Sequence, residues 1–318
     1  MGEHIILSAS EGSAGSSVHD RTPRGKRAHA TWAGSERRLA WLMVSPTVVV
    51  VLAIALIPVL ETVYLSLHHS TVVQTGSFAG LDNYRTVWSD PAFHEALANT
   101  AIFTIVSVSI ELAIGLAVAL VLNSQFRGRG WVRAVVLLPW AFPLAVAAVL
   151  ARLMLQDQVG IGAYLARSVG LVNGPILSNP TALLVAIIIV DVWTSTPFMA
   201  FLLLAGLQTI PDNVYEAAQV DGANAWQRFA HITLPLLKPA TLVALLFRTL
   251  QAWAVYDLFY VMALNQTSSL STYVYEDVRV SELQFGPGTA AAVFTFVSSL
   301  AIAAMFLKSF GVRAVQET

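Results

Sequence analysis

Cysteine is absent from the chain, which excludes disulfides and every metal site or thiol reaction that depends on this residue. Charged residues are also scarce, at 12%, and the formal net charge is only -1. The P-loop pattern G-x-x-x-x-G-K-[ST] does not occur, so the chain lacks this route to ATP hydrolysis. The segment "HEALA" (94–98) lacks the second histidine of a zinc helix. We therefore expect no catalytic residue, no metal site and no cofactor in this chain.

Apolar residues take the place of the missing charge. They make up 56% of the 318 residues, too large a share for a soluble globule, so the composition predicts a membrane protein without a nucleic-acid partner. Crossing the hydrocarbon core of a bilayer takes roughly 20 apolar residues in a helix. Six stretches meet this requirement: 40–67, 100–122, 132–154, 181–207, 239–264 and 289–311. No alternating pattern of a transmembrane strand is present, so the predicted fold is all-α and polytopic.

The first 36 residues are rich in Ser, Gly, His and Arg and show no helical or strand periodicity, which predicts a disordered cytoplasmic tail. The apolar run that begins near Leu39 is long, so we expect a spanning anchor and not a cleaved signal. The expected organisation is a tail at 1–36, a first transmembrane helix with an external segment at 37–97, a transmembrane domain at 98–312, and a short C-terminal tail at 313–318.

The distribution of cations predicts the orientation, because cytoplasmic segments of membrane proteins carry an excess of Lys and Arg. With a cytoplasmic N-terminus, 13 of the 18 cations fall inside and 4 fall outside, and Arg248 lies within a span. Both termini are therefore expected in the cytoplasm. The inside set is Arg21, Arg24, Lys26, Arg27, Arg37, Arg38, Arg127, Arg129, Arg133, Arg228, Lys238, Lys308 and Arg313, and the outside set is Arg85, Arg152, Arg167 and Arg279.

One polar stretch, "EAAQVDGANAWQRFAHITLP" (216–235), interrupts the apolar sequence on the predicted cytoplasmic side. Gly222 separates two short helical pieces and tolerates positive φ, and Pro235 is expected to end the second piece. The pattern predicts a helix-turn-helix on the membrane face. Trp226 beside small residues fits a docking surface for another protein, or an amphipathic helix that rests on lipid headgroups.

The spacing of Glu-Ala-Ala, Gly and Ile-x-Leu-Pro in this stretch resembles the EAA loop of binding-protein-dependent ABC importer permeases. The resemblance implies the transmembrane domain of a type I ABC importer, with a coupling loop at 211–235 that sits in a cleft of a separate ATPase. That ATPase would bind the ATP and Mg. A second homologous permease, giving a heterodimer, and an extracytoplasmic solute-binding protein are the other implied partners. The implied coupling residues are Glu216, Ala217, Ala218, Asp221, Gly222, Trp226, Ile232, Leu234 and Pro235.

Three further segments, 78–100, 191–211 and 232–262, are similar to the sugar-importing, maltose-type branch, which implies a carbohydrate carried across the bacterial plasma membrane. Gln251 stands where many relatives have an acidic residue, and "ALNQTSSLSTY" replaces a Gly-rich turn. These departures leave open which sugar is carried, and a polyol phosphate such as glycerol phosphate is the alternative. A secondary transporter without an ATPase is a different class, but residues 40–154 and 181–311 show no inverted repeat.

Ionisable residues inside spans are costly and mark functional sites or helix contacts. Glu111 is expected to bond a neighbouring helix, and Arg248 a carboxylate or the partner subunit. Asp191 fits a translocation pathway or a helix interface. A membrane-anchored scaffold without transport is disfavoured by these charges.

A continuous helix over 239–264 would place four residues on one face, with Asp257 at its edge: Thr249, Trp253, Tyr256 and Tyr260. Aromatic rings and hydroxyls on one face suit a sugar, although a packing stripe or an interfacial aromatic belt has the same pattern. The predicted substrate pathway comprises Asp191, Thr249, Trp253, Tyr256 and Asp257.

Overall fold

The computed structural model describes residues 28–71, 75–172, 174–264, 266–279 and 285–309, and of residues 28–37 only the backbone. The chain divides into two compact units, residues 1–58 and 59–318. Helix α1 (Ala28–Ser66) begins inside the segment predicted as a tail and contains the candidate span Arg38–Ser66. The predicted disorder of residues 1–27 and the C-terminal tail at 313–318 lie outside the described residues.

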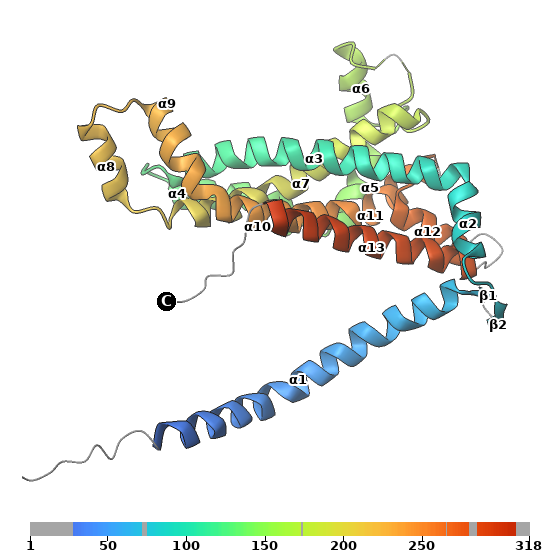
Figure 1. Cartoon of the computed structure of the whole chain (residues 1–318). Helices are drawn as coiled ribbons and strands as arrows, with labels where there is room; N and C mark the ends of the chain where they lie inside the picture. Colours follow the sequence, from blue (N-terminus) through green and yellow to red (C-terminus); the bar gives the residue numbers. More distant parts are fainter. Residues whose placement is uncertain (1–27, 72–74, 173, 265, 280–284, 310–318) are drawn as a thin grey trace, which may run out of the picture. The chain divides into compact units, whose positions relative to one another are not determined.

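The second unit is a helical assembly in which α3, α7, α10 and α13 are the long helices (Figure 1). A small antiparallel hairpin of β1 (His68–Ser70) and β2 (Thr75–Phe78) follows α1. The helices are α2 (Asp82–Ser89), α3 (Pro91–Asn123), α4 (Arg129–Ala141), α5 (Leu144–Met154), α6 (Ile161–Ser168), α7 (Pro180–Leu207), α8 (Asp212–Val220), α9 (Ala225–Arg228), α10 (Leu234–Trp253), α11 (Asp257–Ala263), α12 (Leu270–Arg279) and α13 (Phe285–Ser309).

The core forms where α3 and α7 pack side by side, and α10 lies against both. A side-chain Cβ at Gly115 would lie 2.8 Å from Cγ of Met199, so the glycine lets α3 approach α7 closely. Phe103 and Leu203 are fully buried in the same cluster. The outward sides of the long helices expose large apolar side chains, as expected for surfaces that face lipid.

Five helices in the described residues are long and apolar enough to cross a membrane. They correspond to five of the six predicted spans. The third predicted span, 132–154, is a broken pair, because α4 and α5 meet at an angle of 85°. Phe142 and Pro143 form the bend, and Pro143 has no backbone N–H with which to continue α4.

The prediction that the fifth span runs unbroken to residue 264 is wrong. Helix α10 ends at Trp253, and α11 begins at Asp257. Side chains from other elements satisfy backbone groups that the break frees: Ser269 Oγ donates to the Val255 carbonyl at 2.8 Å. Arg152 Nη1 donates to the Met262 carbonyl at 2.6 Å and so places a cation at the C-terminal end of α11.

The prediction that Pro235 ends the second helical piece of the polar stretch is also wrong. A π-helical turn at Phe229–Thr233 joins α9 to α10, so that Ala225–Trp253 runs as one helical segment. The Leu234 N–H donates to the Phe229 carbonyl, five residues back. This wider turn precedes Pro235 and accommodates its ring at the start of α10.

Helices α2 and α12 lie at the end of the assembly where α3 and α13 begin (Figure 1). The Leu270 N–H donates to Thr100 Oγ1 at 2.9 Å, and the Tyr273 hydroxyl donates to Asp90 at 2.7 Å. Burial raises the pKa of the Tyr273 hydroxyl, and so does its hydrogen bond to Asp90. These contacts tie α12 to the first turns of α3.

Candidate functional site

A buried ion network joins three of the long helices. Arg248 on α10 donates from Nε to Glu111 Oε2 on α3 at 2.6 Å and from Nη2 to Glu111 Oε1 at 2.7 Å. The same Nη2 donates to Asp191 Oδ2 on α7 at 3.0 Å. Nη1 donates to Gln251 Oε1 at 3.0 Å. Arg248 is 4% exposed, and Glu111 is fully buried. The predicted carboxylate contact of Arg248 and the predicted helix contact of Glu111 are therefore both present.

A cavity of about 340 Å³ adjoins this network. Its walls contain the two helix breaks, because Phe142 comes from the bend between α4 and α5 and Tyr256 from the gap between α10 and α11. Broken helices expose backbone groups and carry many substrate sites in membrane transporters. The lining residues are Trp140, Phe142, Leu144, Asp191, Thr194, Ser195, Arg248, Gln251, Ala252, Ala254, Val255, Tyr256 and Asp257.

The lining combines aromatic rings with hydrogen-bonding groups. Trp140 stacks on Phe198 with a centroid distance of 6.0 Å, and Tyr256 stacks on Tyr260 at 5.1 Å. Ser195 donates to Asp191 Oδ1 at 3.3 Å, while Asp257 is exposed at the start of α11. A solute here would meet flat apolar surfaces and hydrogen-bond acceptors together.

The structure brings three predicted pathway residues together at this cavity, namely Asp191, Tyr256 and Asp257. Thr249 and Trp253 are not among the described residues that line it. The Trp253 indole N–H donates to Ser298 Oγ on α13 at 2.8 Å, so this ring packs on another helix. The single aromatic face expected for span five does not form, because the helix breaks after Trp253.

Sequence reasoning missed Trp140 and Phe142, which lie in "PWAFP" (139–143). Two prolines four residues apart within an apolar run were the available signal for a broken span. In the sequence, Gln251 stands out only as a departure from relatives. In the structure its side-chain oxygen accepts from Arg248.

The coupling loop (211–235) has the predicted helix-turn-helix form. Helices α8 and α9 are joined at Gly222, whose φ is +79° as predicted. Asn224 caps α9, since its side chain accepts from the Gln227 N–H while the Gln227 side chain accepts from the Asn224 N–H. The Tyr215 hydroxyl lies 3.0 Å from Thr233 Oγ1 and ties α8 to the π-helical turn.

One side of this loop is open. Trp226 is 72% exposed, and no described atom lies within 4 Å of a Cβ built on Gly222. Ala218 and Ile232 are half-buried. The other residues assigned to coupling are exposed: Glu216, Ala217, Asp221, Leu234 and Pro235. The described residues contain no group of three or more His, Asp or Glu placed to hold a metal ion.

Comparison with known proteins gives the family. Residues 111–313 match the model of the binding-protein-dependent transport system inner membrane component. The chain is 40% identical to the trehalose/maltose transport system permease protein MalF of Thermococcus litoralis, over 86% of this chain and 94% of that protein. It is 37% identical to the trehalose transport system permease protein SugA of Mycobacterium tuberculosis, over 94% of this chain and 97% of that protein.

The fold also matches a solved structure. One chain of a bacterial alginate ABC transporter, in complex with an alginate pentasaccharide-bound periplasmic protein, superposes with a TM-score of 0.75. The match covers 87% of this chain and 96% of that chain, at 24% sequence identity. The chain thus belongs to the family of binding-protein-dependent transport system inner membrane components, the permease subunits of ABC importers.

Proposed function

We propose that this chain is the permease subunit through which an ATP-driven importer carries a carbohydrate across the plasma membrane. The observation that carries the proposal is the cavity between two helix breaks, where aromatic rings and hydrogen-bonding groups meet within the membrane-spanning part of the chain. The names of the relatives, which are transport permeases for trehalose, maltose and lactose, support the same substrate class.

The charges around the cavity favour a neutral sugar over a polyol phosphate. Two carboxylates, Asp191 and Asp257, line the cavity with a single guanidinium, that of Arg248. Four of the five N–H groups of that guanidinium already donate to protein oxygens, which leaves a single N–H, at Nη1, for a phosphate. An anionic solute would meet an excess of like charge at short range.

The partners follow from family membership and from the open surface of the coupling loop. The exposed residues around Gly222 and Trp226 dock on a cytoplasmic ATPase that binds ATP and Mg. A second homologous permease completes the pathway, and an extracytoplasmic solute-binding protein delivers the sugar. ATP shifts the assembly between inward-facing and outward-facing states only if it binds them with different affinity.

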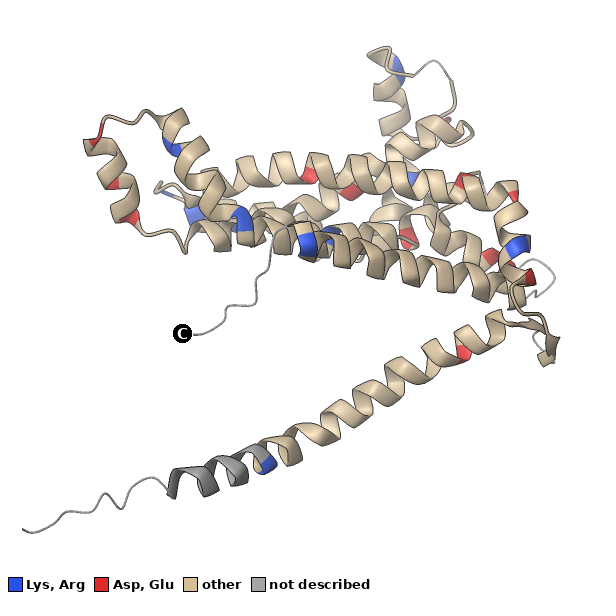
Figure 2. Cartoon of the chain, in the orientation of Figure 1, with Lys and Arg blue, Asp and Glu red and all other residues tan. Residues whose placement is uncertain are grey.

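We also propose an orientation with both termini in the cytoplasm. Arg129 and Arg133 lie in the first turns of α4 and Arg228 ends α9, and Lys and Arg positions occur at the end of the second unit that carries α8 and α9 (Figure 2). Cations gathered near the coupling loop agree with the excess of Lys and Arg expected on the cytoplasmic side.

Uptake by the reconstituted importer tests the proposal. The complex in liposomes, with its solute-binding protein, should take up labelled trehalose or maltose and not glycerol phosphate. Tyr256→Ala and Asp257→Ala should lower uptake about tenfold while the external protein still binds solute, because each removes a stacking or hydrogen-bonding group from the cavity. Thr249→Ala, on α10 outside the cavity, is the matched control and should behave as wild type. Unchanged uptake by both cavity variants, or preferential uptake of glycerol phosphate, would contradict the proposal.

A further inference from the structure

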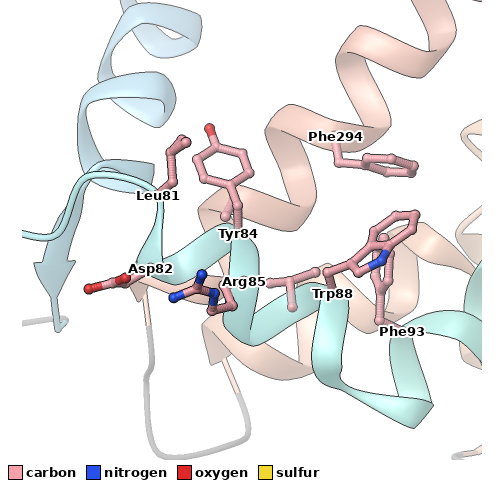
Figure 3. A pocket seen from close by; sticks show the side chains of 9 residues that line it. Leu81, Asp82, Tyr84, Arg85, Trp88, Phe93 and Phe294 are labelled. Carbon is pink, nitrogen blue, oxygen red and sulfur yellow. The ribbon is translucent and has the colours of Figure 1, made fainter.

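A second cavity, of about 500 Å³, lies between α2 and α13 and shares no lining residue with the first (Figure 3). Tyr84, Arg85 and Trp88 of α2 line it together with Phe93 at the start of α3 and Phe294 of α13. Trp88 and Phe294 have ring centroids 6.2 Å apart, and those of Phe93 and Phe294 are 5.2 Å apart. Neither the ion network nor the coupling loop contributes to these walls.

The cavity lies where three candidate spans end. The Asn83 side chain of α2 donates to the Ser66 carbonyl at the end of α1 at 2.8 Å. Gly286, in the first turn of α13, lies so close that an added Cβ would be 2.8 Å from the Asn83 amide. Helix α3 begins at Pro91, directly after α2. Helix α2 therefore lies beside the ends of three candidate spans.

The two ends of this cavity differ in polarity. Phe294 lies nine residues after Phe285, or about 13 Å along α13, and so lines the cavity from within a candidate span. Arg85 and Asp82 project together on the side away from Phe294 (Figure 3). They are one helical turn apart, and in the described part of the chain neither side chain forms an ion pair. A charged rim of both signs thus adjoins an aromatic interior.

We propose that this cavity binds a zwitterionic phospholipid of the surrounding bilayer. The lipid phosphate accepts hydrogen bonds from the Arg85 guanidinium, and the headgroup ammonium pairs with the Asp82 carboxylate. One acyl chain lies along Trp88 and Phe294, whose rings offer an apolar wall that continues into the hydrocarbon. Trp88 is 57% exposed without such an occupant, which is a large apolar surface for the chain to leave open.

A sugar fits this cavity less well than a lipid. The Tyr84 hydroxyl is 2.8 Å from Ser66 Oγ and is already used within the protein. The interior walls beyond it are Val87, Phe93, Ala290 and Phe294, which offer no polar side chain for hydroxyls distributed around a ring. Polar groups at one end only match a molecule that is itself polar at one end.

Photocrosslinking in nanodiscs tests the site. The assembled transporter is placed in nanodiscs of equal parts phosphatidylethanolamine and phosphatidylglycerol, with a diazirine in the acyl chain of either lipid in turn. We expect phosphatidylethanolamine adducts on the α13 peptide that contains Phe294. Arg85→Gln should lower their yield about tenfold, because a charge-assisted bond to the phosphate is lost. Asp82→Asn should remove the preference for phosphatidylethanolamine over phosphatidylglycerol.

Two controls make the result decisive. Arg279→Gln removes an exposed cation from α12, outside the cavity, and should leave the adducts unchanged. Trp88→Ala removes the aromatic wall and should lower adduct yield while uptake and thermal stability persist. Equal adduct yields in wild type, Arg85→Gln and Trp88→Ala would overturn the lipid site. Loss of stimulation by the solute-binding protein in Trp88→Ala, with adducts unchanged, would also overturn it and make this surface a protein-docking site.

Discussion

The guanidinium of one residue, Arg248, links three helices in the centre of this protein. Arg248 connects α10 to Glu111 on α3 and to Asp191 on α7, and its remaining amino group binds Gln251. Taking these charges out of water is costly, and the cost is offset only while every partner is present. The network therefore makes the relative placement of three helices depend on one side chain.

We expect Arg248→Met to destabilise the assembled permease by about 3–5 kcal/mol, because it leaves two buried carboxylates without a cation. Thermal melting of the purified complex measures the change. The matched control is Ser195→Ala, which loses one 3.3 Å hydrogen bond to Asp191 and should cost only about 0.5–1.5 kcal/mol. Adding Glu111→Gln and Asp191→Asn to Arg248→Met should restore much of the lost stability. Equal melting of Arg248→Met and wild type would contradict the prediction.

At the residue scale, the contacts of Arg248 could be predicted because a charge within a span must find an opposite charge or a cavity. The sequence could not say which carboxylates it would reach, since Glu111 and Asp191 lie on different helices. The predicted role of Trp253 depended on a helix that continues past it, and its indole bonds Ser298 on α13 instead. A hydrogen bond between residues so far apart in the sequence cannot be predicted from local periodicity.

At the scale of elements, one of the two helix breaks has a local signal in the sequence and the other has none. The bend between α4 and α5 has a local cause in Pro143, which removes a backbone donor. The gap between α10 and α11 contains neither proline nor glycine. Within this gap Ser269, from a distant part of the chain, donates to the Val255 carbonyl. A span was therefore correctly expected, but its break was not predictable from local signals.

We expect Pro143→Ala to reduce the bend between α4 and α5 and to lower uptake, because alanine restores a backbone N–H and frees φ. Spin labels on Trp131→Cys and Leu153→Cys, two exposed positions on the two helices, measure the change as a longer separation. Pro139→Ala is the matched control, since that proline lies inside α4 and not at the bend. An unchanged separation in Pro143→Ala would show that packing alone sets the angle.

Gly222 in the coupling loop can be compared with Gly170, which lies outside this loop and has a similar backbone conformation. Gly222 has φ of +79° and Gly170 of +72°, and a Cβ on either would meet no described atom within 4 Å. Leucine at either site should cost about 1 kcal/mol through strain in the left-handed region. Only Gly222→Leu should abolish solute-stimulated ATP hydrolysis, because only this side chain would obstruct the ATPase. Equal ATP hydrolysis by the two variants would argue that the loop is an amphipathic helix on lipid.

At the scale of the whole molecule, the helical fold and five of its spans could be predicted, because about 20 apolar residues have few alternatives in lipid. Ser70 and Thr75 pair in a hairpin between two spans. The sequence of this hairpin has no apolar pattern from which it could be predicted. The cavities were predicted only in part, since the predicted pathway named Asp191, Tyr256 and Asp257 and missed Trp140 and Phe142. Each is lined by residues from elements far apart in the sequence, and such contacts arise only on packing.

Cysteine labelling tests the proposed orientation, and the absence of native cysteine gives a clean background. Ser77→Cys and Ser178→Cys, both at exposed positions, should react with an impermeant maleimide added to intact cells. Ser124→Cys, exposed at the other end of α3, should react only after the membrane is permeabilised. The reverse pattern of labelling would place the coupling loop outside and refute the orientation.

Ala225–Trp253 is one helical segment, so the directions in which side chains point at its two ends are fixed relative to each other. Trp226 and Arg248 belong to this one segment, which is about 40 Å long at 1.5 Å per residue, with no loop to absorb a twist. Each residue added to or removed from its α-helical part, between the π-helical turn and Arg248, turns one end by about 100° relative to the other. A single insertion would aim Trp226 away from its present direction while every side chain of the ion network stayed unchanged. The number of residues in this segment is therefore as constrained as their identity.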